Sequence, residues 1–411
     1  MEMTQIGELR LQWAEAHMDV IGAIRNRFKR ERPFKGIRIS MALHVEAKTG
    51  IFALLLKDGG ATVRMASCNP LSSDDSVVAA LKENHGMEVF ARKGESREEY
   101  YEYLNKALDL RPNVIIDDGG DLTKIVHLER KDLLGDIIGG NEETTTGVVR
   151  LKAMERDGVL KFPMFDVNDA KMKHLFDNRY GTGQSTLDGI MSSTNILIAG
   201  KRLVVAGYGW CGRGIAMRMK GMGALVTVTE VDPVKAIEAA MDGFAVEPIH
   251  HAVKQADLVV TATGMKSVVT YEDLLTAKNG VILANSGHFN NEVPFDDLEA
   301  RSIEKKQIRE NIKMYRLENG NTVYLLSDGR LVNLAAGQGH PVEIMDMSFA
   351  IQALTAENLV KNHKHLERRV YAVPSEIDEE VAKIKLKALG ISIDSLTPDQ
   401  LKYMNSWEEG T

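Results

Sequence analysis

One stretch in the middle third of the chain constrains the fold more than any other feature of the sequence. Residues 201–207, Lys-Arg-Leu-Val-Val-Ala-Gly, predict a buried strand with an apolar centre, and residues 207–212, Gly-Tyr-Gly-Trp-Cys-Gly, match the pattern G-x-G-x-x-G. Residues 215–222 predict a helix, and residues 225–230 predict a second strand that ends in the carboxylate of Glu230, 23 residues after the first glycine. Strand, glycines, helix, strand and terminal acid in this order are typical of a parallel α/β sheet that binds a dinucleotide.

The same stretch predicts which dinucleotide is bound. The glycines permit a tight turn and a close approach of the backbone, and the amino end of the following helix attracts a pyrophosphate. The carboxylate of Glu230 accepts hydrogen bonds from a ribose 2′-hydroxyl and repels a 2′-phosphate, which favours NAD over NADP. Lys235, close by in the sequence, weakens this preference slightly. The alternative is a glycine-rich turn without a ligand, but the ordered context favours binding.

Alternating strand-like and helix-like segments extend the prediction to the whole chain. Strands that alternate with helical patterns of about ten residues are typical of crossover units in a parallel sheet. We therefore predict an α/β fold with two doubly wound parallel-sheet domains, one of them a Rossmann domain, and a small helical segment at the C-terminal end. The expected helices cover residues 9–29, 49–58, 73–85 and 98–108, and the expected strands cover residues 36–40, 61–66, 88–91, 113–117, 256–261 and 280–284.

The composition is that of an ordinary globular protein. Hydrophobic residues make up 44% and charged residues 27% of the 411 residues, which excludes extended disorder and a fibrous chain. Asp and Glu outnumber Lys and Arg by 58 to 51, and the net charge of −7 argues against nucleic acid or an anionic membrane as the main partner. Two cysteines, Cys68 and Cys211, are too few for a disulfide framework or a four-cysteine zinc site.

Nothing in the sequence predicts export or membrane insertion. The first residues, MEMTQIGELRLQ, carry acidic side chains and a helical pattern instead of the basic start and apolar core of a secretory signal. No apolar run in the sequence approaches the ~20 residues that a membrane-spanning helix needs. We therefore expect a cytoplasmic protein without a membrane partner.

Several polar residues follow predicted strands, where parallel sheets collect their ligands. His44 comes just after the first strand and Asp118 just after a later one, so both can face one crevice, although a lone histidine is more often structural than catalytic. Residues 117–121, Asp-Asp-Gly-Gly-Asp, suggest either a metal loop or a solvated acidic turn. No calcium-loop spacing follows them, and the histidines at 250–251 and 363–365 lack partners at ligand spacing. We therefore predict no metal.

A series of short segments along the chain, together with the glycine loop, forms a pattern typical of one protein family. They are Leu43-His44, Ser67-Cys-Asn69, Asp117-Asp-Gly-Gly-Asp-Leu-Thr123, Glu142-Glu-Thr-Thr-Thr-Gly147, Val167-Asn-Asp169, Phe176-Asp-Asn178, Ala206-Gly-Tyr-Gly209, Thr229-Glu230, Gly287-His-Phe289, Gly329-Arg-Leu-Val-Asn-Leu334 and Gly339-His-Pro341. With these segments, in this order, the chain resembles the S-adenosylhomocysteine hydrolase family over nearly its whole length. The resemblance implies a homo-oligomer, commonly a tetramer. It also implies a substrate-binding domain from residues 1–170 and 342–389, a Rossmann NAD-binding domain at 184–338 and a C-terminal segment at 390–411.

The chemistry of the family explains how an enzyme with a dehydrogenase cofactor can have no net redox product. Tightly held NAD+ oxidises the 3′-hydroxyl of S-adenosyl-L-homocysteine to a ketone, which acidifies the neighbouring C4′–H. A base removes that proton, L-homocysteine leaves from C5′, water adds, and the ketone is reduced again to give adenosine.

The resemblance implies which residues carry these steps. Lys173 with Asn168 handles the 3′-hydroxyl proton, assisted by Asp177. Asp118 and His44 are the acid–base candidates near C4′ and C5′. Burial beside NAD+ is expected to lower the pKa of Lys173 enough for it to act as a base.

The resemblance also implies the binding residues. Glu143 binds ribose hydroxyls and His340 closes over the substrate. The residues expected near the purine base are Glu46, Lys48 and Gln338. The NAD contacts are expected at Thr144, Thr145, Thr146, Asn178, Gly207, Gly209, Trp210, Cys211, Gly212, Arg213, Gly214, Glu230, Lys235, Ser286, Gly287, His288 and Asn333.

Three positions depart from the family pattern. Thr182 stands where many members have a cysteine, so no thiol is required there. The chain ends Asn405-Ser-Trp-Glu-Glu-Gly-Thr411, without the extension containing Lys and Tyr that reaches the NAD of a neighbouring subunit, so NAD is expected to exchange more readily. Lys48 stands where many relatives carry glutamate.

Lys48 bears on the identity of the purine. Adenine offers an N6 donor that a carboxylate accepts, whereas an ammonium has no acceptor; hypoxanthine offers a carbonyl oxygen that Lys48 can satisfy. The alternative substrate is therefore S-inosyl-L-homocysteine, which would give inosine and homocysteine. Equally, Lys48 can point to solvent or pair with Glu46. Remoter alternatives are an NAD dehydrogenase with a net redox product and a silent regulatory homologue, against which the intact acid–base residues argue.

Overall fold

The first of two sheets unites strands from both ends of the chain. The computed structural model describes residues 2–407. Seven parallel strands follow the order β15-β6-β5-β4-β1-β2-β3, and β15 comes from the C-terminal part of the chain. The strands are β1 Arg38–Leu43, β2 Thr62–Ser67, β3 Glu88–Phe90, β4 Val114–Asp117, β5 Gly139–Glu142, β6 Met164–Asp166 and β15 Val370–Ala372.

Helices cover both faces of this sheet because successive side chains of a strand point to opposite faces. The helices are α1 Met3–Ala16, α2 Asp19–Glu31, α3 Ala47–Asp58, α4 Asp75–Glu83, α5 Arg97–Leu108, α6 Asp121–Leu128, α7 Thr145–Arg156, α8 Lys171–His174, α16 Val342–Asn362 and α17 Ser375–Ala388. Helix α9, Thr182–Thr194, packs instead with the second sheet, whose core includes its Ile190. In β4, Val114 and Ile116 join a core with α1, α2, α3 and α16, whereas Ile115 joins a core with α5, α6 and α7. The sheet is therefore doubly wound.

The second sheet has eight strands in the order β12-β13-β14-β11-β10-β7-β8-β9. They are β7 Arg202–Ala206, β8 Leu225–Thr229, β9 Ala245–Val246, β10 Leu258–Thr261, β11 Val281–Asn285, β12 Glu304–Arg309, β13 Ile312–Arg316 and β14 Thr322–Leu326. Its helices are α10 Trp210–Gly221, α11 Pro233–Met241, α12 Ile249–Ala252, α13 Tyr271–Thr276, α14 Phe295–Arg301 and α15 Val332–Ala335. The predicted α/β fold is confirmed, with one difference: the β12-β13-β14 edge of this sheet is antiparallel.

The long helix predicted at residues 9–29 is two helices, α1 and α2. The backbone leaves the helical conformation at His17 and Met18. The first amides of α2, Val20 N and Ile21 N, donate to the carboxylate of Asp346 at 3.2 and 2.8 Å. This contact comes from α16, far along the chain, so the local hydrophobic pattern does not contain it.

The helix after the glycine loop begins earlier than the predicted residue 215. α10 starts at Trp210, and two of the glycines lie inside it because other backbone passes close by. A Cβ at Gly212 would lie 1.9 Å from Gly207 O, and a Cβ at Gly214 would lie 1.9 Å from Arg179 O. The glycines therefore serve close packing of the helix as well as the turn.

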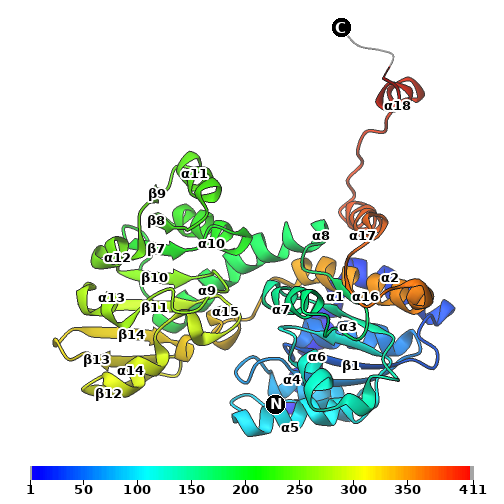
Figure 1. The fold of residues 1–411 in the computed structure, drawn as a ribbon, viewed down its shortest axis with the longest axis horizontal. Coiled ribbons are helices and arrows are strands. Elements are labelled where there is room, and N and C mark those ends of the chain that lie inside the picture. Colours follow the sequence, from blue (N-terminus) through cyan, green and yellow to red (C-terminus); the bar gives the residue numbers. More distant parts are fainter. Residues whose placement is uncertain (1, 408–411) are drawn as a thin grey trace.

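The C-terminal end of the described chain extends away from both sheets. α18 (Pro398–Met404) follows an extended segment after α17 (Figure 1). Residues 408–411 of the predicted C-terminal segment lie outside the described residues. Within residues 2–407, no helix combines the length and the apolar character that crossing a membrane requires.

Candidate active site

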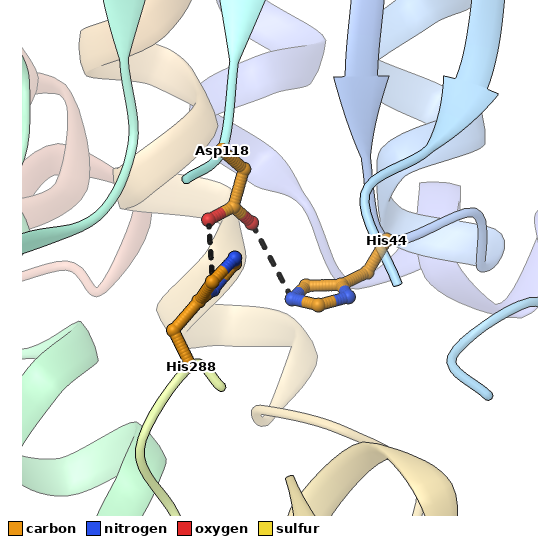
Figure 2. Close-up of side chains that lie close together, drawn as sticks. All are labelled: His44, Asp118 and His288. Atoms are coloured by element: carbon orange, nitrogen blue, oxygen red, sulfur yellow. Dashed lines mark ion pairs between the residues drawn. The ribbon is translucent and has the colours of Figure 1, made fainter. Parts of the chain in front are cut away.

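The carboxyl edges of the two sheets meet and carry polar residues just after their strands. β1 leads to His44, β4 to Asp118, and β11 to the segment that contains His288. His44 Nε2 lies 3.3 Å from Asp118 Oδ2, and His288 Nδ1 lies 3.6 Å from Asp118 Oδ1 (Figure 2). One carboxylate of the first sheet therefore contacts an imidazole from each sheet.

Polar groups surround both nitrogens of His44. Nδ1 lies 2.7 Å from Ser72 Oγ, and Nε2 faces Asp118 Oδ2. Cys68 Sγ donates to Asp118 Oδ2 at 3.5 Å. Burial lowers the pKa of His44 to about 4 despite the opposing effect of Asp118, so the ring is a neutral base at neutral pH.

Lys173 stands at the centre of a second polar cluster. Its Nζ lies 3.0 Å from Asn178 Oδ1 and 3.3 Å from Asn168 Oδ1, and it pairs with Asp177 Oδ1 at 3.3 Å and Glu143 Oε1 at 3.5 Å. Burial by itself would lower the pKa of Lys173, but the carboxylates of Asp177 and Glu143 outweigh it and raise that pKa. The expected lowering of the Lys173 pKa depends on the positive charge of bound NAD+ and stays a prediction; burial alone does not produce it.

Glu143 follows β5 and is held by a helix from the other end of the chain. Ser348 Oγ donates to Oε1 at 2.8 Å, and Gln352 Nε2 donates to Oε2 at 2.5 Å. Both residues belong to α16 and are fully buried. Neither is among the residues predicted from the sequence, although two polar residues four positions apart in an apolar helix are a recognisable signal.

The two clusters line one cavity of about 130 Å³. A larger cleft of about 1100 Å³ adjoins it and shares Glu46, Leu334 and His340 with it. The predicted residues that the smaller cavity brings together are His44, Glu46, Asp118, Glu143, Thr144, Lys173, Asp177, Asn178, Cys211, Ser286, His288, Asn333 and His340. Lys48 and Gln338 line the larger cleft, and Asn168 contacts Lys173 without lining either space.

The glycine loop has the shape that a dinucleotide requires. Gly207 has φ +97°, in the left-handed region that favours glycine. Gly209 directly precedes α10, and a Cβ built there meets no atom within 4 Å. The amino end of a 12-residue helix therefore faces open space, where its free amides attract a pyrophosphate. These residues fit NAD.

Glu230 follows β8, and both of its carboxylate oxygens accept backbone hydrogen bonds. Oε2 accepts from Tyr208 N at 2.7 Å, and Oε1 accepts from Val231 N at 2.7 Å and Asp232 N at 3.0 Å. The carboxylate is thereby fixed beside the glycine loop.

Three residues predicted to contact NAD, Trp210, Arg213 and Lys235, have side chains that contact other protein groups. Arg213 pairs with Glu238 and lies over the Trp210 ring, 4.8 Å from its centroid. Lys235 is exposed and pairs with Asp232 at 3.8 Å. The structure does not bring these three side chains to the cavity that holds His44 and Lys173.

A dinucleotide loop on one sheet and a buried acid–base cluster where two sheets meet define an NAD-dependent enzyme. Residues 1–134 match a family model described as S-adenosyl-L-homocysteine hydrolase, and residues 178–339 match the model of its NAD binding domain. Adenosylhomocysteinase from Thermoplasma acidophilum is 71% identical over 98% of this chain and 99% of its own length. The chain belongs to the S-adenosyl-L-homocysteine hydrolase family.

Relatives with two different names align over the whole chain. S-inosyl-L-homocysteine hydrolase from Methanocaldococcus jannaschii is 57% identical over 98% of this chain and 97% of its own length. Adenosylhomocysteinase from Aquifex aeolicus is 54% identical over 100% of this chain and 98% of its own length. The resemblance that the sequence indicated is confirmed, and with it the hydrolase class and NAD as the cofactor.

Replacement of Glu230 by serine is expected to narrow the preference for NAD over NADP. The carboxylate repels a 2′-phosphate, and hydrogen bonds of charged groups contribute ~1.5–3 kcal/mol, or about 10- to 150-fold in affinity. The measurement is the ratio of the dissociation constants for NAD and NADP. Lys235→Ala is the control: it removes a cation from the same region and should leave the ratio unchanged or increase it. Equal affinity of the unmodified enzyme for both cofactors would overturn the assignment of Glu230 to the ribose.

Proposed function

We propose that the chain catalyses the reversible, NAD-dependent hydrolysis of S-adenosyl-L-homocysteine to adenosine and L-homocysteine. The observation that carries the proposal is one cavity with two proton-transfer centres, Lys173 with Asp177 and His44 with Asp118. The reaction oxidises the 3′-carbon and then eliminates homocysteine across C4′ and C5′. Each of these two steps needs its own proton-transfer centre. A simple dehydrogenase, which moves a hydride and a single proton, needs one.

At the first centre, Lys173 binds the 3′-oxygen of the substrate and exchanges its proton. Asn168 and Asn178 orient the ammonium, and Asp177 balances its charge. Bound NAD supplies the acceptor for the hydride of the 3′-carbon and returns it at the end of the cycle. Its nicotinamide end would be held by cavity residues that include Thr144, Asn178, Cys211, Ser286 and Asn333. Glu143, fixed by α16, binds the ribose hydroxyls.

At the second centre, His44 and Asp118 take up the C4′ proton and protonate the departing thiolate of homocysteine. The neutral ring of His44 has one unprotonated nitrogen, which suits the first of these tasks. His288 completes the centre from the second sheet. His340 closes over the substrate; its Nδ1 lies 3.3 Å from Asp177 Oδ1.

Incubation of the NAD-loaded enzyme with homocysteine and adenosine, or homocysteine and inosine, tests the proposed reaction. The expected product is the thioether of the nucleoside, identified by mass spectrometry, without net formation of NADH. Stoichiometric release of NADH without a thioether would identify a net dehydrogenase. Absence of both products, with NAD and nucleoside bound, would identify a silent regulatory homologue.

The Glu46–Lys48 pair in the larger cleft is proposed to contact the purine. Lys48 is 8% exposed, and its Nζ donates to Gln338 O at 2.9 Å and pairs with Glu46 Oε2 at 3.1 Å. Lys48 therefore does not point to solvent. Among the described residues these contacts take two of its three ammonium hydrogens, and the third can donate to a purine.

An ammonium beside a carboxylate presents a donor and an acceptor side by side. Such a pair matches N1 and the N6 amino group of adenine, and also the carbonyl and N1–H of hypoxanthine. The pair therefore suits either purine, and S-inosyl-L-homocysteine, whose hypoxanthine has an acceptor at position 6 for Lys48, is the second candidate substrate.

If Lys48 donates to a purine carbonyl, Lys48→Glu is expected to shift the preference from the inosyl to the adenosyl substrate. Leaving a buried polar group without its partner costs ~1–3 kcal/mol, or about 5- to 150-fold in kcat/KM. The measurement is kcat/KM for both thioethers under identical NAD loading, with Lys48→Met as a control that removes the donor without adding an acceptor. An adenosyl preference that neither substitution changes would leave Lys48 without a role in base selection.

We also propose the division into a substrate-binding domain (1–170 and 342–389), an NAD-binding domain (184–338) and a C-terminal segment (390–411). The pairing of β15 with β6, and the confinement of the second sheet to residues 202–326, support this division. A cytoplasmic homo-oligomer, of the tetrameric kind common in the family, is part of the proposal. Exposed apolar residues of the C-terminal segment, Ile393, Tyr403 and Trp407, support association, and sedimentation equilibrium measures it.

A further inference from the structure

The cluster of His44, Asp118 and His288 has a geometry that its acid–base role does not require. One ligand atom from each residue lies within 4.8 Å of the other two. The separations from the carboxylate oxygens are 3.3 Å to His44 Nε2 and 3.6 Å to His288 Nδ1 (Figure 2). Ligand atoms 2.0–2.1 Å from a tetrahedral zinc ion are about 3.3–3.4 Å apart. The two histidine–carboxylate separations are close to this value, although they involve different oxygens of Asp118, and small side-chain rotations would bring the three ligand atoms of the cluster to zinc spacing.

The orientation of both rings suits a cation. His44 Nδ1 lies 2.7 Å from Ser72 Oγ, so Nε2 is the ring nitrogen that faces the Asp118 carboxylate and is placed to bind an ion there. The His288 ring packs against Gly119, where a Cβ would lie 2.3 Å from Nε2, which leaves Nδ1 directed at Asp118. The second ring nitrogen of His44 thus contacts a polar group outside the cluster, as is usual for metal-binding histidines, and His288 is positioned by packing.

We propose that His44 Nε2, Asp118 and His288 Nδ1 form a binding site for a divalent transition-metal ion of the zinc type, whose binding blocks the second proton-transfer centre. Two imidazoles and one carboxylate suit Zn²⁺, whereas Mg²⁺ prefers oxygen ligands throughout. Three protein ligands leave the fourth tetrahedral position to a water in the cavity. The ion occupies the groups that move protons at C4′ and C5′, so metal and substrate exclude each other.

Access to this site exists in the structure. The cavity that contains the cluster adjoins the larger cleft, and the two share Glu46, Leu334 and His340. A hydrated ion can therefore reach the three ligands by the route that a nucleoside would use. Adenosine or inosine bound in the cavity should prevent metal binding for the same reason.

Calorimetric titration of the NAD-loaded full chain with Zn²⁺ alone tests the site without any turnover, so its result is independent of the proposed reaction. One ion per chain is expected. His288→Ala should lower the affinity more than ~100-fold, and Ser72→Ala, which only frees the His44 ring, should lower it ~10- to 100-fold. The surface pairs supply matched controls: His250→Ala with His251→Ala, and His363→Ala with His365→Ala, should keep both the affinity and the activity of the unmodified enzyme.

A second measurement on the unmodified enzyme avoids dependence on a variant that fails to fold. Co²⁺ bound at this site should give the strong visible absorption of a tetrahedral nitrogen and oxygen environment, and adenosine should abolish it. Thiolate charge transfer would instead make Cys68 a ligand and overturn the proposed ligand set. Unchanged affinity in His288→Ala, or loss of the ion in the surface-pair variants, would overturn the site.

Discussion

Replacement of Lys173 by alanine is expected to slow reduction of the bound cofactor by about 100- to 10,000-fold, the usual contribution of a positioned proton-transfer group. Lys173 is 4% exposed and lies between Asn168, Asn178 and Asp177, so its loss leaves the 3′-oxygen without a proton acceptor. The measurement is the absorbance of reduced nicotinamide in a single turnover, after the NAD-loaded enzyme is mixed with adenosine. A variant that reduces its cofactor at the wild-type rate would assign the 3′-proton to another group.

Asp177→Asn is the companion variant that separates proton transfer from a structural role of Lys173. The Asp177 carboxylate helps to raise the pKa of Lys173, so its removal lowers that pKa. Lys173 accepts a proton only in its neutral form, and the rate of cofactor reduction should therefore rise with pH. In Asp177→Asn the rise should move to lower pH, and a profile that keeps its position would contradict the assignment. Retained NAD binding by both variants is the control for folding.

The parallel strands were predictable because they are short apolar runs rich in β-branched residues. The strand predicted at 113–117 is β4, Val114–Asp117, and the run at 280–284 is β11, Val281–Asn285. The antiparallel edge strand β12, Glu304–Arg309, was not predicted. All six of its residues are exposed and four are charged, so it has no apolar alternation and resembles a loop.

The acidic segment 117–121 shows what spacing alone leaves open. A solvated turn and a metal loop were both compatible with its sequence, yet Asp117 is fully buried. Its carboxylate accepts from Thr123 N at 2.8 Å and Asp118 N at 3.2 Å, which fixes the start of α6. Burial raises the pKa of Asp117 to about 6. Asp117 is buried by β1 and β5, which lie on either side of β4 only once the sheet has formed, so the local sequence does not show this burial.

The residues that orient the site were harder to predict than those that line it. His44, Asp118, Lys173 and His288 each follow a strand or belong to a recognisable segment. Ser72 and Gln352 act through other side chains, from positions 28 residues after His44 and 209 residues after Glu143. The apolar wall formed by Leu43, Leu331, Met345 and Phe349 has the same composition as the core. Only the fold shows that these residues face a cavity.

Asp118→Asn is expected to leave reduction of the bound cofactor nearly intact and to slow homocysteine release by about 100- to 10,000-fold. The asparagine amide cannot take up the C4′ proton. It also lacks the negative charge that faces His44 Nε2, 3.3 Å from the present Oδ2, so an imidazolium formed at His44 loses its stabilising partner. One substitution therefore weakens both groups of the second centre while the Lys173 centre keeps its contacts.

Two signals recorded on the same reaction test this expectation. The nicotinamide absorbance follows oxidation, and a thiol reagent follows the release of homocysteine from S-adenosyl-L-homocysteine. Asp121→Asn is the matched control, because Asp121 lies in the same segment but pairs with Arg150 at 2.9 Å and should affect neither signal. If Asp118→Asn slows oxidation as much as release, Asp118 acts at the 3′-carbon and the two centres are not separate. If the cofactor is reduced at the wild-type rate and then stays reduced, the reaction has stopped after oxidation of the 3′-carbon, at the removal of the C4′ proton.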